Sequence, residues 1–111
     1  MTVDYEKLNP GIRRTVKWLN DHGFLTSDSG DGKTHEFECD RDHAYVVILV
    51  PTPEELVAQT QRLVALLEGQ GVVLGPVGFN DAPCIQASYD PVNGLPVIDL
   101  MNLDDDKLFH K

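Results

Sequence analysis

Apolar residues recur at helical spacing near the start of the chain. They share one face of a helix with a threonine beside them: Ile12, Val16, Leu19 and Thr15. Asn9 and Pro10 favour a helix start, because Asn caps free amides and Pro lacks only an N–H that the first turn leaves unbonded. Gly23, followed by Phe24, is typical of a helix end closed by a left-handed glycine. The pattern predicts an amphipathic helix between these two signals.

A second helix is predicted after residue 51. Thr52-Pro53-Glu54-Glu55 has the spacing of a capping box with Pro at the first helical position. The residues that follow again place one stripe on a single face: Leu56, Thr60, Leu63, Val64 and Leu67. Gly69 or Gly71 ends this helix.

The strands are predicted from a different pattern. Residues 44–50 are continuously apolar and largely β-branched, which indicates an interior strand covered on both faces. Residues 35–40 alternate between two classes of side chain, as a strand does. After the second helix, strands are expected at 72–79, with an edge or a bulge at Gly75-Pro76, and then at 84–89 and 95–101.

The order of these elements predicts the fold class. It is α+β, with a single-layer, mostly antiparallel sheet of about five strands and two helices on one face. Asp90–Gly94 is expected to be a hairpin loop, and Pro96 to stand where no ladder hydrogen bond is needed. The tail from residue 102 is predicted to be a short helix capped by acids or a docking arm in an oligomer. The whole chain, 1–111, is expected to be one domain.

Composition narrows the possible partners. The net charge of −9 argues against direct DNA or RNA binding, because phosphate contacts need clustered Lys and Arg, and it leaves open a basic protein partner. The longest apolar run, 44–50, is too short to cross a membrane. Cys39 and Cys84 have no metal-type spacing, and no signal peptide is visible, so we expect two reduced thiols in a cytoplasmic protein.

The candidate site is the segment from Thr26 to Thr34. Its residues all favour turns, so the segment is predicted to be a loop, and its central members are Ser27, Asp28, Ser29, Gly30, Asp31, Gly32 and Lys33. Residues 27–34 imitate a P-loop, S-x-x-x-x-G-K-T. A true P-loop follows a strand and begins a helix, whereas a predicted helix precedes this segment and a strand-like alternation follows it.

The sequence also contains partial patterns of two kinds of metal site, for calcium and for zinc. The acids of the segment lack the D-x-D-x-D-G spacing of a calcium loop. His35, Cys39 and His43 stand four residues apart, but on a strand that spacing spans about 13 Å, too far for ligands of one zinc ion. We therefore predict no metal and no cofactor.

The segment fits an anion or nucleotide better than a metal. Successive amides in a glycine-rich turn can form an anion-holding nest, and Asp28 or Asp31 can accept from ribose hydroxyls. The cations near it in sequence are Arg13, Arg14, Lys33 and Arg41. The predicted ligand-binding set is Arg13, Arg14, Ser27, Asp28, Ser29, Gly30, Asp31, Gly32, Lys33 and Arg41. The alternatives left open are a decorated surface loop and, for the arginines, a solvated helix face.

No catalytic set emerges from local sequence. Ser27, Ser29 and Ser88 have no histidine and acid patterned around them, and there is no G-x-S-x-G elbow. We therefore expect a binding protein rather than an enzyme, although distant residues can still assemble a site.

Several stretches together resemble small phage-encoded accessory proteins: GIRRTVKWLNDHGFLTSDSGDG, CDRDHAYVVILVP, IQASYDP and VIDLMNLDDD. The likeness covers most of the chain. Among such proteins, the chain is similar in size and α+β build to the anti-Thoeris sponges, which capture cyclic ADP-ribose-type or related nucleotide signals without cleaving them. The resemblance implies an anti-defence homo-oligomer in the cytoplasm of a bacterial host cell, and it assigns no individual binding residue.

Two functions of different class follow. One is sequestration of a small nucleotide signal, which needs Lys33, Arg41 and the arginines of the first helix gathered at one pocket. The other is inhibition of a basic host protein, with imitation of nucleic acid as one form of it, and this needs a continuous acidic face. The acids expected on that face are Glu36, Glu38, Asp40 and Asp104 to Asp106.

Overall fold

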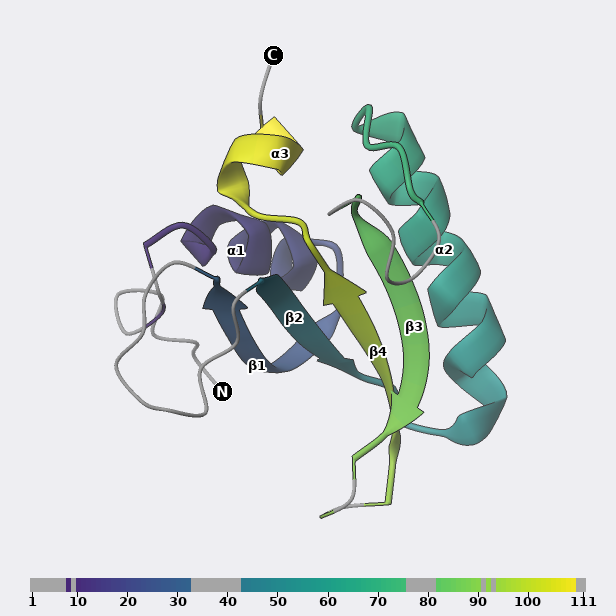
Figure 1. Ribbon diagram of the computed structural model, residues 1–111. Helices are drawn as coiled ribbons and strands as arrows, with labels where there is room; N and C mark the ends of the chain where they lie inside the picture. The colour runs from purple at the N-terminus through teal and green to yellow at the C-terminus, as the bar shows by residue number, and fades with distance from the viewer. Residues whose placement is uncertain are drawn as a thin grey trace.

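The computed structural model describes residues 8, 10–32, 43–75, 82–90, 92 and 94–109. Its elements in chain order are α1 (Arg13–Asp21), β1 (Leu25–Asp31), β2 (Ala44–Leu49), the 3-10 turn η2 (Pro53–Glu55), α2 (Leu56–Gly69), β3 (Cys84–Tyr89), β4 (Pro96–Met101) and α3 (Asp105–Phe109) (Figure 1). The predicted α+β class is confirmed.

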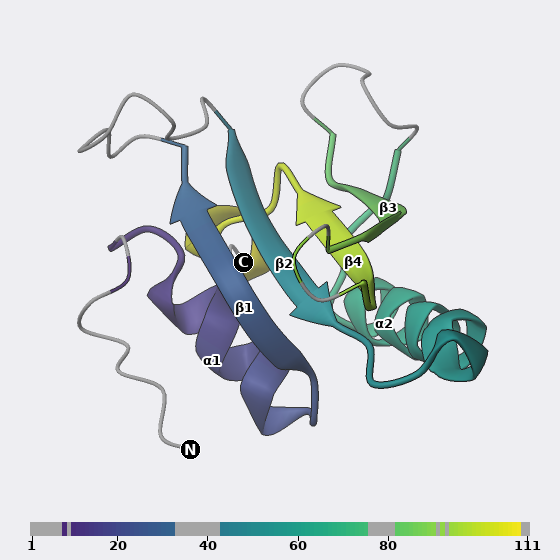
Figure 2. The same ribbon diagram turned by 90° about the horizontal axis from the view of Figure 1, so that it is seen from below.

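The described strands form one sheet of four, in the order β1-β2-β4-β3, and every pairing is antiparallel. The strand after residue 44 is interior, as its apolar run predicts. Seen from below, β1, β2 and β4 lie in front of α1 and α3, so this face of the sheet is turned away from these helices (Figure 2). The sequence predicted about five strands; of these, the strand at 35–40 lies outside the described residues and the strand at 72–79 lies partly outside them.

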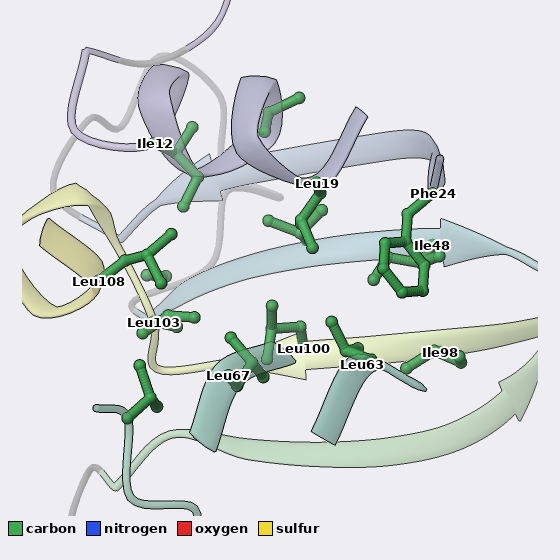
Figure 3. Packing of buried hydrophobic residues seen from close by; sticks show 14 of the residues in the cluster. Ile12, Leu19, Phe24, Ile48, Leu63, Leu67, Ile98, Leu100, Leu103 and Leu108 are labelled. Carbon is green, nitrogen blue, oxygen red and sulfur yellow. The ribbon is translucent and has the colours of Figure 1, made fainter. Parts of the chain in front are cut away.

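The hydrophobic core lies between the helices and one face of the sheet. It joins side chains from α1, α2, β2, β4 and the C-terminal segment, which point toward one another in Figure 3. The largest fully buried members include Ile12, Leu19, Ile48, Leu63, Leu67, Ile98, Leu100, Leu103 and Leu108. The stripe predicted on the first helix is confirmed, and Leu63 and Leu67 are the buried part of the second stripe. Both long helices therefore cover the same face.

The start of α1 differs from the prediction. The helix begins at Arg13, with Pro10 and Gly11 in a turn before it, and Ile12 at the N-cap position makes no side-chain cap. A carboxylate from the other end of the chain supplies the cap: Asp105 accepts hydrogen bonds from the Arg14 and Thr15 amides at 3.1 and 2.6 Å. Local sequence signals could not place this helix start, because its cap is a tertiary contact.

The end of α1 is where the sequence predicts it. Gly23 has φ +88°, its amide donates to Asn20 O at 3.0 Å, and the Phe24 amide donates to Leu19 O at 3.0 Å. These two bonds are those of a Schellman motif.

Replacing Gly23 with Ala is expected to lower the free energy of unfolding by about 1 kcal/mol, because an L side chain at this φ is strained. A Cβ there would be 3.6 Å from the Arg62 guanidinium, which adds no clash. Urea denaturation of the variant checks the value. An unchanged midpoint would contradict it.

The start of α2 lies where the sequence predicts it, but the predicted capping box does not form. Pro53–Glu55 forms a 3-10 turn ahead of the helix, and the Thr52 side chain makes no cap bond to the backbone. Its hydroxyl instead lies 3.3 Å from Glu55 Oε2. The helix ends at Gly69, and Gly71, with φ +90°, closes it as the left-handed residue.

The predicted loop at 26–34 is wrong over most of its length. Leu25–Asp31 forms β1, which pairs along β2 with a bulge between Thr26 and Asp28. Turn propensity is a local property of these residues. Hydrogen bonding to the edge of β2 and packing against α1 are tertiary interactions, and they override that propensity here.

Other predicted elements fare unevenly. Residues 72–75 have no regular structure, so the strand predicted at 72–79 is wrong over this described part, and its remaining residues, 76–79, lie outside the described residues. The strand predicted at 35–40 is outside the described residues. The tail forms the short helix α3, and Asp104 caps it by accepting from the Lys107 amide at 3.0 Å. Within the described ranges, no helix is both long and apolar enough to cross a membrane.

Candidate functional site

The face of the sheet opposite the core is the surface on which a site can be built. We call it the helix-free face, because α1, α2 and α3 pack on the other side. Among the side chains that strand alternation and register place on it are Asp28, Tyr45, Val47, Val97 and Asp99. Their sequence neighbours Val46, Ile48, Ile98 and Leu100 belong to the core.

A pocket of about 310 Å³ opens on this face. It gathers residues from all four strands and from the turn after β3: Ser27, Asp28, Val47, Ser88, Tyr89, Asp90, Val97 and Asp99. Three of these carry carboxylates, and no lysine, arginine or histidine is among the described residues that line it. The pocket is therefore acidic, with two valines as its apolar floor.

The register explains why these acids meet. Asp28 pairs with Val47, and Val47 pairs with Asp99, so a carboxylate stands on either side of the valine in one row across three strands. Adjacent strands are about 4.8 Å apart, so the two Cα atoms of the acids are separated by roughly 10 Å. This spacing leaves room for one cationic side chain between the two carboxylates.

Contacts fix the Asp28 side chain. Its Oδ1 accepts from the Ser29 amide at 2.9 Å, and the Tyr45 hydroxyl lies 3.4 Å from each of its two oxygens. Tyr45 is buried, so its hydroxyl contacts the carboxylate from the protein side, while Asp28 itself is exposed. These contacts favour one orientation of the Asp28 carboxylate, which helps it to recognise a partner.

The predicted ligand set does not come together as one group. Ser27 and Asp28 line the pocket, and Ser27 is there because it is the extra residue of the β1 bulge. Arg13 and Arg14 lie on α1, which packs against the opposite face. The Arg13 Nε donates to Leu8 O at 3.0 Å, and the Arg14 guanidinium sits 4.1 Å from the Phe109 ring centroid.

The glycine and aspartate residues of the segment have structural roles. Gly30 is buried within β1 and pairs with Tyr45. Asp31 is 6% exposed and accepts from the Gly11 amide at 3.3 Å. Ser29 pairs with the core residue Val46, so it lies on the helix side. Gly32 passes close to the backbone of His43, and Lys33 and Arg41 lie outside the described residues.

A nucleotide base could stack on the ring of Trp18, Phe24 or Tyr89, and of these three rings one lines the pocket. Tyr89 is 62% exposed and lines it. Phe24 is 2% exposed, and the Arg62 guanidinium covers its ring at 4.3 Å from the centroid. Trp18 packs against His22, with ring centroids 4.6 Å apart. Neither of these two rings is available to a ligand at the helix-free face.

Sequence reasoning missed Asp99, Asp90 and Ser88 as site residues. One signal pointed to Asp99: it interrupts the otherwise uncharged run Leu95 to Met101, in a strand that continues the core on both sides. An acid at such a place marks the exposed face of the strand. That it lies near Asp28 follows only from the order β1-β2-β4, which joins strands far apart in sequence.

A larger hollow, of about 520 Å³, lies between the end of α2 and α3. Gly71, Val72, Val73, Pro83, Asp106 and Lys107 line it. The Lys107 ammonium there donates to Asn102 O at 2.8 Å. Convergent polar groups distinguish a binding site from a hollow, and the acidic pocket has more of them, so it is the better candidate despite its smaller volume.

Metal ligands do not converge in the described part of the chain, where no three His, Cys, Asp or Glu side chains are placed to hold an ion. Cys84 is a free, buried thiol, and Cys39 lies outside the described residues.

Comparison with known proteins adds no relative. No protein-family model, curated protein or solved structure matches the chain.

Proposed function

We propose that the chain is a binding protein that presents the helix-free face to a basic surface of another protein. The observation that carries this proposal is the acidic pocket, which is lined by one carboxylate from β1, one from β4 and one from the turn after β3, with no cation among the described lining residues. The net charge of −9 supports it, because a strongly acidic chain attracts a basic partner over long range.

The mechanism is electrostatic recognition on a rigid platform. Asp28 and Asp99 stand on paired strands, so their backbone is already fixed and only short side chains have to be ordered when a lysine or arginine binds between them. The two valines beneath, Val47 and Val97, contact the apolar stem of the same side chain. A basic host protein bound this way would be inhibited if the bound surface is the one it uses for nucleic acid.

Removing the two pocket carboxylates tests the proposal. Asp28→Asn with Asp99→Asn is expected to weaken binding of a short lysine-rich peptide by about tenfold at low salt, because two charge-assisted contacts are lost. Calorimetry measures this, and the wild-type affinity should fall as salt rises.

Glu54→Gln with Glu68→Gln is the matched control, since both acids are exposed on the helix layer and the loss of charge is the same. We expect this variant to bind like the wild type. Equal weakening by both double variants would mean that net charge alone acts, and the helix-free face would have no special role.

Sequestration of a nucleotide signal is the second candidate. One observation favours it: Ser27 and Asp28, both in the predicted ligand set, share the pocket with the exposed Tyr89 ring, so hydroxyl and carboxylate acceptors stand near a stacking surface. The acids disfavour phosphates, and Arg13 and Arg14 are on the other layer. Calorimetry with cyclic ADP-ribose isomers and cyclic dinucleotides separates the two candidates. The resemblance to phage accessory proteins is compatible with either as an anti-defence activity.

A further inference from the structure

The two edges of the sheet formed by the described strands, β1 and β3, are built differently. β1 is interrupted by the bulge at Ser27 and carries Asp28 and Asp31. Bulges and charges are the devices by which proteins protect an edge from added strands. β3, Cys-Ile-Gln-Ala-Ser-Tyr, has no charged residue and no proline, and its register with β4 runs without a break from Cys84 to Tyr89. The β3 edge therefore lacks these protections.

Hydrogen-bond alternation identifies the groups that β3 turns outward. The Asp90 amide donates to Leu95 O at 2.9 Å, so the pair just beyond Tyr89 and Pro96 is a hydrogen-bonded one. Bonded and non-bonded pairs alternate in an antiparallel ladder. The backbone groups of Gln86 and Ser88 thus face β4, whereas those of Ile85, Ala87 and Tyr89 face away from it. Residues 86–89 are exposed.

We propose that an extended, basic segment of the partner protein adds to this edge as a fifth strand beside β3. The inference rests on the function proposed above and specifies how the partner binds. Main-chain bonds to Ile85, Ala87 and Tyr89 would supply affinity, and alternate side chains would supply specificity, as in other cases of strand addition.

Charge selects the occupant. On an added strand, side chains opposite Gln86 and Ser88 project over the helix-free face. Gln86 pairs with Asp99 across β3 and β4, and Ser88 lines the pocket with Asp90 and Asp99. Lysine or arginine at these alternate positions would approach the acids. A second copy of this chain would instead bring the same acids to both sides of the seam, where like charges repel.

Amide hydrogen exchange tests the placement of the strand. With a peptide that alternates lysine and threonine, exchange at Ile85, Ala87 and Tyr89 is expected to slow by about tenfold or more, because these amides gain partners. Gln86 and Ser88, already bonded to β4, should change little. Binding without this alternation would overturn the added strand and leave the proposed function standing, whereas no binding of any basic peptide would remove both.

Two further arms remove backbone donors. Ala87→Pro deletes an outward N–H without breaking a bond to β4, and is expected to weaken the peptide by about tenfold, while Ala87→Thr keeps the donor and the affinity. A peptide with N-methylated threonines should lose affinity for the unaltered chain to a similar extent. This second measurement tests the added strand even if the Ala87→Pro variant does not fold. Protection of the three amides in the free chain that grows with its concentration would show a second copy at this edge and overturn the proposal.

Discussion

Gly32→Ala is expected to lower the free energy of unfolding by about 2–4 kcal/mol, a large part of the stability of a domain this size. Gly32 has φ +73°, and an added Cβ would lie 2.6 Å from His43 C and 2.7 Å from Ala44 N. Both neighbours are backbone at the start of β2, so neither can turn aside as a side chain would. The strain of the left-handed conformation and the displacement of a strand end therefore add. Urea denaturation measures the sum.

Gly71→Ala is the matched control for this variant. Its φ is +90°, and nothing lies within 4 Å of the Cβ that would be added. It carries the conformational strain alone, for which about 1 kcal/mol is expected. If Gly32→Ala costs no more than Gly71→Ala, the close approach to His43 relaxes freely, and the junction of β1 and β2 is looser than the distances indicate.

The role of Gly32 illustrates what sequence can and cannot assign. A glycine among turn-forming residues predicts unusual backbone, and Gly32 has it. The prediction attached that backbone to a ligand, whereas the observed reason is the approach of a strand from later in the chain. The same holds for Asp31, whose carboxylate contacts the Gly11 amide. At both positions the residue type indicated that the residue has a specific role, but only the tertiary contacts show that the role is structural.

Elements with a clear hydrophobic pattern in their own sequence were predictable. The stripe of α1 and the apolar run of β2 each report burial over several turns or pairs, so single exceptions do not mask them. β1 has no such period: Ser27, Asp28, Ser29 and Gly30 favour turns, and the strand exists because β2 and α1 offer it partners. The acidic pocket could not be predicted either, because Asp28 and Asp99 come near each other only through the strand order β1-β2-β4.

Asp105→Ala is expected to lower the free energy of unfolding by about 2–3 kcal/mol, more than most surface substitutions. The Asp105 carboxylate accepts from the Arg14 amide, the Thr15 amide and the Thr15 hydroxyl, the last at 2.8 Å. Thr15 is fully buried, so its amide and hydroxyl lose these bonds where water cannot replace them. The negative charge also faces the positive end of α1.

Further variants separate capping from charge. Asp105→Asn retains one oxygen that accepts hydrogen bonds but has no charge, so its cost is expected to fall between those of the wild type and Asp105→Ala. Glu54→Ala, at an exposed acid of η2, removes one negative charge and corrects for the self-repulsion of a chain with net charge −9. Denaturant titration ranks the three, and faster exchange of the Thr15 amide in Asp105→Ala locates the loss at the start of α1. Equal costs for Asp105→Ala and Glu54→Ala would mean that α1 holds its first turn without help from the C-terminal segment.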